Sequence, residues 1–176
     1  MPDGVYTDGT ISGAESVPWV RMSDYRALAS NHCAATAITN LALYFADRGY
    51  PALLKNGSAE ETFRAIHRIV GDGPVMMIAK HAADYFAACG YRLRYSGLGT
   101  PGEIIAATAQ DRPCGILLVD RSFACHWVLG VGWRQYAASG DFYLRVNDNW
   151  SGGIDRYYRP ESGSAWWSVT AYRIDD

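Results

Sequence analysis

Apolar positions in the first half of the chain recur at the spacing of amphipathic helices. Within residues 30–49 they follow the 3.6-residue period of an α-helix. These apolar residues are Ala35, Ile38, Ala42 and Phe45. Ser30 or Asn31 is expected to cap this helix at its start, and Gly49 is expected to end it. Capping residues and the same spacing predict three further helices, over residues 58–71, 75–90 and about 101–110.

The second half of the chain changes to the pattern of β-strands. Four segments rich in β-branched and aromatic residues follow residue 113, and they read GILLV, HWVLGVGW, FYLRVND and WWSVTAYRI. An earlier segment, YRLRY, also reads as a strand. Three of the later strands are joined by loops too short for a crossover helix, so the sheet is expected to be antiparallel. Helices first and strands second predict an α+β domain.

The start of the chain shows no such periodicity. Residues 1–16 are rich in Gly, Asp, Ser and Thr, and we expect them to form a flexible N-terminal arm. The remainder, residues 17–176, has the length of a single domain. A chain of this size buries about 70% of its unfolded surface without metals or disulfides.

Charge and composition narrow the possible functions. The net charge is −2, and the Lys and Arg residues form no basic stripe, so no nucleic-acid partner is expected. The first twenty residues lack a basic segment followed by an apolar one, and no run of 18 apolar residues occurs. We therefore expect a soluble chain without membrane insertion, cytoplasmic or secreted after removal of a leader. The sequence does not indicate an oligomeric state.

The four cysteines do not follow a metal-binding pattern. Cys33, Cys89, Cys114 and Cys125 form no CxxC pair and no zinc-like spacing. Cys125 precedes His126 directly, so on a strand the two would point to opposite faces and could not share a metal. If Cys33 stays free, at most one disulfide can form. No metal or cofactor is expected.

Cys33 is the candidate nucleophile. It lies where the first helix is expected to begin, and a helix N-terminus favours a thiolate. A thiol with an ordinary pKa near 8.5 falls to roughly 3.5–7.5 when a helix N-terminus and a protonated His stabilise its anion. His126 on a strand and Asp148 further along complete the composition of a nucleophile, a base and an orienting acid.

A hairpin register places two of these residues together. If the turn in QYAASGD centres on Ala137, His126 and Asp148 become cross-strand neighbours with Cβ atoms about 4.5–5.5 Å apart. The carboxylate could then orient the imidazole. Asn147 and Asn149 would point to the other face of the sheet, because neighbouring side chains alternate.

A second register is also compatible with this sequence. A turn centred on the middle of AASG would pair Asp148 with Leu129 instead. A β-bulge at Gly130 or Gly132 would then be needed to bring Asp148 back to His126.

The segments that carry these residues resemble the papain-like cysteine peptidases. The resemblance is closest to the branch that processes bacteriocin leaders of the double-glycine type, and it spans residues 17–174. The matching segments are VPWV, NHCAATAITNLALYFADRGY, GEIIAATAQDRPCGILLVD, HWVLGVGW and VNDNW. The resemblance implies a papain-like fold, in which the nucleophile begins a helix that packs on a C-terminal antiparallel sheet.

The resemblance also implies the role of each residue. Cys33 would be the nucleophile, His126 the general base and acid, and Asp148 the residue that orients the imidazole. Trp150 would shield the contact between His126 and Asp148 from water. The enzyme would hydrolyse a peptide or protein substrate through a Cys33 thioester and would need no cofactor.

One expected feature of the family is missing. A Gln five or six residues before the nucleophile usually supplies an oxyanion donor, but Leu28 and Ala27 occupy those positions. Asn31, Ser30 or a main-chain amide is the expected substitute. Two alternatives stay open: a transglutaminase-like acyltransferase with the same three residues, and a non-catalytic module that binds peptides.

Overall fold

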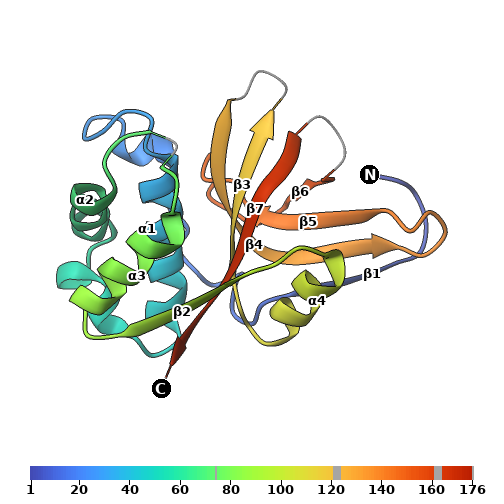
Figure 1. Cartoon of the computed structure of the whole chain (residues 1–176), viewed down its shortest axis with the longest axis horizontal. Coiled ribbons are helices and arrows are strands. Elements are labelled where there is room, and N and C mark those ends of the chain that lie inside the picture. Colours follow the sequence, from blue (N-terminus) through green and yellow to red (C-terminus); the bar gives the residue numbers. More distant parts are fainter. Residues whose placement is uncertain (74, 121–123, 161–163, 176) are drawn as a thin grey trace.

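Helices and sheet form separate layers in the computed structural model of the chain, which describes residues 1–73, 75–120, 124–160 and 164–175 (Figure 1). The helices are α1 (Cys33–Asp47), α2 (Ala59–Val70), α3 (Ile78–Ala88) and α4 (Pro101–Ala109). The strands are β1 (Tyr6–Thr10), β2 (Arg92–Gly97), β3 (Cys114–Asp120), β4 (Cys125–Tyr136), β5 (Phe142–Asn147), β6 (Arg156–Tyr158) and β7 (Ser164–Asp175). The predicted α+β architecture is confirmed.

Local capping explains where most helices begin and end. Ser58 Oγ accepts a hydrogen bond from the Glu61 N–H at 3.3 Å, and α2 ends at Gly71 with φ 76°, a left-handed conformation that suits glycine. Thr100 and Glu103 form a reciprocal capping box at the start of α4. These helices lie where the sequence predicts them.

The first helix begins later than predicted. Neither Ser30 nor Asn31 is its N-cap, because α1 starts at Cys33 and His32 occupies the capping position without a side-chain hydrogen bond to the helix. Asn31 has φ 49°, which cannot belong to a right-handed helix. Cys33 is therefore the first residue of the helix, so its main-chain N–H is not used within the helix.

The sheet is antiparallel, with the strand order β2-β7-β3-β4-β5-β6 and with β1 paired to β4. Strand β1 runs alongside the second half of β4, so residues 6–10 are not the flexible arm predicted from composition. An edge strand forms through main-chain hydrogen bonds and needs no apolar pattern. Gly132 permits the contact, because a Cβ there would collide with the carbonyl oxygen of Gly9.

Both faces of the sheet are buried. Helices α1 and α3 pack against the sheet on one side, with α2 packed against these two helices, and Leu117 and Trp127 contribute to the larger core there. On the opposite face α4 packs with Ile116 and Val128 in a second core (Figure 1). Because neighbouring residues of β3 and β4 belong to different cores, these strands are apolar along most of their length.

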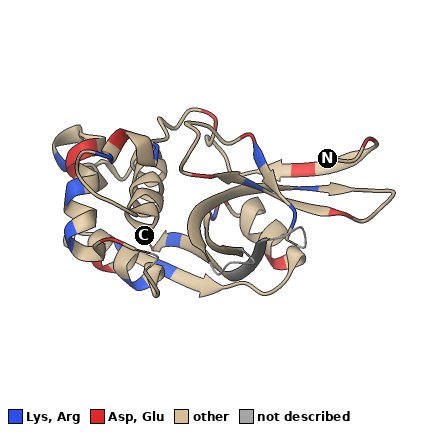
Figure 2. Cartoon of the chain, turned by 90° about the horizontal axis from the view of Figure 1, so that it is seen from above, with Lys and Arg blue, Asp and Glu red and all other residues tan. Residues whose placement is uncertain are grey.

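Charged side chains of both signs are interspersed over the helices and the sheet (Figure 2). Several form local ion pairs, such as Arg64 with Glu60 on α2 and Lys80 with Asp84 on α3. Within the described ranges, no helix combines the length and apolar character needed to cross a bilayer.

Candidate active site

Cys33 lies buried at the first position of α1, with 1% of its surface exposed. The main-chain N–H of Trp127 on β4 lies near its Sγ. Burial is the largest influence and raises the pKa of the Cys33 thiol, while the N–H groups of Trp127, Ala34 and Cys33 act in the opposite direction. The prediction of a lowered pKa is therefore wrong for this structure, because the helix terminus does not offset the loss of solvation.

His126 lies near the start of β4 and is held by the main chain. Its Nε2 lies 2.7 Å from the carbonyl oxygen of Asp148. A carbonyl can only accept a hydrogen bond, so Nε2 carries the proton and Nδ1 of the neutral ring keeps a lone pair. Burial lowers the pKa of His126, although the hydrogen bond to Asp148 and the charge of its carboxylate act in the opposite direction.

The carboxylate of Asp148 does not accept the hydrogen bond from the imidazole of His126. Its Oδ1 accepts hydrogen bonds from the main-chain N–H of Trp150 at 3.0 Å and of Ser151 at 2.7 Å, and from Ser151 Oγ at 2.8 Å. Its Oδ2 lies 3.6 Å from Nε of Arg156. The structure thus brings Asp148 to His126 through its carbonyl group, while its side chain holds the following turn.

The observed register explains this difference. Leu129 pairs with Asn147 and Gly132 with Arg145, with a bulge between Gly130 and Gly132. The predicted register that makes His126 and Asp148 cross-strand partners is wrong. The bulge shifts the pairing by one residue, which is too little to place Asp148 opposite His126. Strand β5 ends at Asn147, so Asp148 reaches His126 where the chain turns beyond the paired strands.

Trp150 covers the imidazole. Its ring stacks on His126 with a centroid distance of 3.9 Å and an interplanar angle of 5°. The other side of the Trp150 side chain faces solvent, and 58% of the residue is exposed. An aromatic ring in this position restricts the rotation of the imidazole and keeps water from one of its faces.

A cleft of about 310 Å³ brings the nucleophile and the histidine to one surface. It is lined by Met22, Asn31, Cys33, Leu118, Ala124, Cys125, His126, Trp150 and Tyr158. Most of these side chains are apolar or aromatic, as is usual for a binding site with a few polar groups. Sequence reasoning misses Met22 and Leu118, because no local pattern distinguishes them from core residues.

The side chain amide nearest the nucleophile in sequence also belongs to this cleft. Asn31 lines it and is exposed, whereas Leu28 and Ala27, the expected positions of the family's Gln, do not line it. Ser30 is engaged elsewhere, with its Oγ 3.5 Å from Asp72 Oδ2. Of the side chains predicted as a substitute donor, Asn31 is the one at the cleft.

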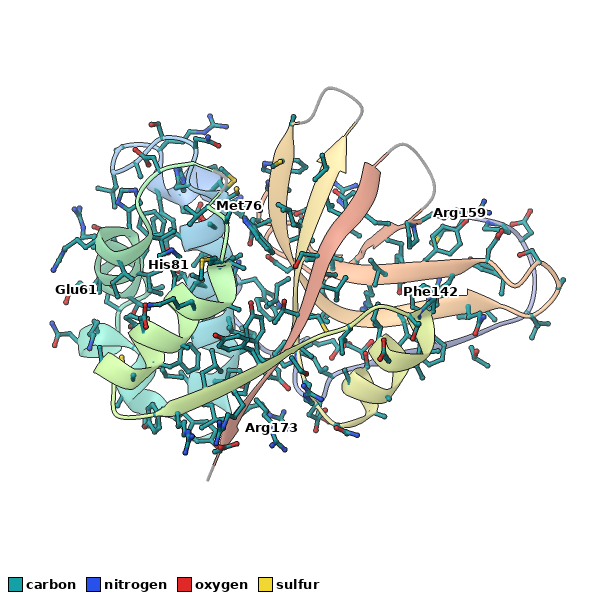
Figure 3. The ribbon with its side chains drawn as sticks, viewed as in Figure 1. Glu61, Met76, His81, Phe142, Arg159 and Arg173 are labelled. Carbon is teal, nitrogen blue, oxygen red and sulfur yellow. The ribbon has the colours of Figure 1, made fainter. Side chains whose placement is uncertain are left out.

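Apart from Cys125, the remaining described histidines and cysteines do not line the cleft. His32 is buried, with Nε2 3.0 Å from the Met22 carbonyl oxygen, and His81 lies on α3 in the helical layer (Figure 3). Cys89 packs against the larger core and Cys114 belongs to the second core. The part of the chain that the structure describes holds no group of three or more His, Cys, Asp or Glu side chains suited to a metal ion.

Comparison with known proteins supports the fold. No protein-family model and no curated protein sequence matches the chain. Among solved structures, it is similar to a protein from Bacillus anthracis described as a C39-like peptidase, with a TM-score of 0.59 and 10% identity over 95% of this chain and 98% of that one. The Pseudomonas avirulence protein AvrPphB aligns over 93% of this chain and all of its own, at 12% identity and a TM-score of 0.38.

The chain therefore has a papain-like α+β fold, in which N-terminal helices pack on an antiparallel C-terminal sheet. More narrowly, it is the fold of the C39-like peptidase, and the fold expected from the sequence resemblance is confirmed.

Proposed function

We propose that the protein is a cysteine peptidase of the papain-like class, which hydrolyses a peptide or amide bond through a thioester on Cys33. The observation that carries this proposal is that Cys33 and His126 line one cleft, with the imidazole held through Nε2. That arrangement leaves Nδ1 as the ring nitrogen with a lone pair, as a general base requires.

The proposed reaction begins from a neutral thiol and a neutral imidazole, since burial disfavours the charged form of each. As Sγ of Cys33 attacks the substrate carbonyl carbon, Nδ1 of His126 takes the thiol proton. The imidazolium then protonates the leaving amine, and the C–N bond breaks to leave a thioester. His126 next removes a proton from water, whose oxygen attacks the thioester, and the free acid and thiol are released.

Incubation with a diverse peptide pool tests this proposal. New peptide termini, read by mass spectrometry and absent with a Cys33→Ala variant, are the expected result. Products that appear only when a primary amine is added would indicate an acyltransferase instead. If an activity-based thiol probe labels Cys33 no faster than a free thiol and no product forms, the protein is a binding module and the proposal is wrong.

The oxyanion donor is tested by paired substitutions at Asn31 and Ala27. We expect Asn31→Ala to lower kcat by about 10²-fold, the usual cost of one lost oxyanion donor. Ala27→Gln should leave kcat unchanged, because the side chain of Ala27 does not line the cleft. The measurement is steady-state hydrolysis of the best peptide from the pool.

Asn56→Ala is the matched control for Asn31→Ala. Asn56 is also exposed and also has a positive φ, 50° against 49° for Asn31, but it lies beside α2 and outside the cleft. If Asn31→Ala and Asn56→Ala have the same rate, the assignment of the oxyanion donor is wrong.

Substitutions of Asp148 separate its carbonyl from its carboxylate. Asp148→Asn should keep activity within a few-fold, because its amide oxygen can still accept from the N–H groups of Trp150 and Ser151. Asp148→Ala removes these hydrogen bonds and is expected to lower the free energy of unfolding by about 1–3 kcal/mol. Its activity should fall further than that of Asp148→Asn, because the turn that places Trp150 over His126 loosens.

Thermal unfolding and steady-state rates measure both effects. If Asp148→Asn loses as much activity as Asp148→Ala in a folded protein, activity needs the charge of the carboxylate. The hydrogen bonds of this side chain to the turn would then not explain its role.

A further inference from the structure

Three buried asparagines lie directly behind the candidate active site. Asn40 on α1, Asn147 at the end of β5 and Asn149 just beyond it are each 0% exposed. Nδ2 of Asn40 lies 2.8 Å from Oδ1 of Asn149 and 3.0 Å from Oδ1 of Asn147. We call these three residues the amide cluster. Buried amides are costly unless they are hydrogen-bonded, so the cluster is a specific feature of this core.

The amide cluster connects the helix of the nucleophile to the strand of the histidine. Asn40 follows Cys33 by about two turns of α1, so both side chains lie on the same side of the helix. Asn149 Nδ2 donates to the carbonyl oxygen of Trp127 at 2.7 Å, and Trp127 is the neighbour of His126 on β4. One side chain of α1 is thus linked through Asn149 to the main chain beside the imidazole.

The amide cluster also flanks Asp148, whose carbonyl oxygen accepts the hydrogen bond from His126. Asp148 lies between Asn147 and Asn149, and the N–H of Asn149 donates to Oδ1 of Asn147 at 3.2 Å. Asn149 has φ 62°, a left-handed conformation that asparagine tolerates better than most residues. This local turn directs the carbonyl group of Asp148 toward Nε2 of His126 at 2.7 Å.

Further hydrogen bonds hold the cluster from the opposite side. The Val20 N–H donates to Oδ1 of Asn40 at 2.9 Å, and Nδ2 of Asn40 also lies 3.0 Å from the Val20 carbonyl oxygen. The Met22 N–H donates to the carbonyl oxygen of Asn149 at 2.7 Å. Met22 itself lines the cleft, so the cluster also holds part of the cleft wall.

We infer that Asn40 is a positioning residue for His126, which acts through Asn147 and Asn149 to fix the carbonyl group of Asp148 against the imidazole. The inference rests on the proposed function for its effect on catalysis, although the positioning itself is a property of the folded protein. It assigns to the amide cluster the orienting role that the resemblance gives to the carboxylate of Asp148.

Asn40→Leu tests the inference, because leucine has a similar volume but neither accepts nor donates a hydrogen bond. The matched control is Thr39→Val, since Thr39 is equally buried on α1 but donates only to the Ala35 carbonyl oxygen within the helix. The first readout is ¹⁵N NMR of the His126 ring. The wild type should show one tautomer with a protonated, slowly exchanging Nε2, and Asn40→Leu should show mixed tautomers and faster exchange.

The second readout is the pH profile of kcat/KM. Asn40→Leu should lower kcat/KM roughly 10- to 100-fold, as loss of a partner that orients an imidazole ligand does elsewhere, and should shift the acid limb. Thr39→Val should stay within about twofold. If Asn40→Leu does not fold, Asn40→Ser replaces it, and its remaining hydroxyl should give an intermediate NMR effect.

The two readouts separate this inference from the proposed function. A folded Asn40→Leu or Asn40→Ser protein with the wild-type Nε2 signal and exchange rate would overturn the inference, whether or not peptides are cleaved. If no peptide is cleaved by the wild type, the proposed function fails, and the NMR result alone decides the role of Asn40.

Discussion

Replacing Cys33 with Ser is expected to reduce peptide hydrolysis by at least about 10⁴-fold, because it removes the thiol proposed to form the covalent intermediate. Serine is close in size to cysteine, and a hydroxyl is a much weaker nucleophile than a thiol when the same neutral imidazole is its base. The rate should be measured with the best peptide from the pool, with intact-mass spectrometry to detect the thioester in the wild type.

Two further cysteines serve as controls for this result. Cys89 lies outside the cleft, so Cys89→Ser should keep full activity. Cys125→Ser changes a second thiol that lines the cleft. If Cys125→Ser is inactive and Cys33→Ser is active, the nucleophile is misassigned. The circular dichroism spectrum of each variant should match that of the wild type before the rates are compared.

His126→Gln is expected to lower kcat by about 10²–10⁴-fold, the usual contribution of a positioned general base. Glutamine keeps a polar N–H that can reach the carbonyl oxygen of Asp148, so the loss reports the missing base and not a collapsed site. His81→Gln is the matched control, because His81 lies on α3 and not in the cleft.

The pH profile gives the same assignment a second test. Only neutral His126 can take the thiol proton, and burial lowers its pKa from the ordinary 6.5. The rate should therefore stay level as the pH falls toward 6.5 and decline only below that value, when the imidazole becomes protonated. An acid limb well above pH 6.5, or one that remains in His126→Gln, would contradict the assignment.

Prediction succeeded where structure depends on nearby residues. The start of α2 at Ser58 and its end at Gly71 depend on capping hydrogen bonds within one turn, so the residues themselves indicate the boundaries. The strands after residue 113 are apolar and β-branched because both faces of the sheet are buried, and this signal is present in composition alone.

Prediction was less successful where distant segments meet. Strand β1 has a polar sequence and forms through main-chain hydrogen bonds to β4, so no apolar pattern predicts it. The position of Cys33 at a helix start is a local property, and by itself it predicts a lowered pKa for the thiol. The pKa is raised instead because α1 packs against β4 and removes water from the thiol.

The sequence by itself determined the α+β class, the predicted helices and strands, and the choice of Cys33 and His126 as the residues to examine. Only the tertiary structure decided that the Asp148 carbonyl, and not its carboxylate, contacts the imidazole. A single bulge between Gly130 and Gly132 and the left-handed turn at Asn149 set that contact. Asn40 on α1 forms hydrogen bonds with Asn147 and Asn149 on either side of Asp148, and these contacts between segments far apart in the sequence could not be read from the local pattern.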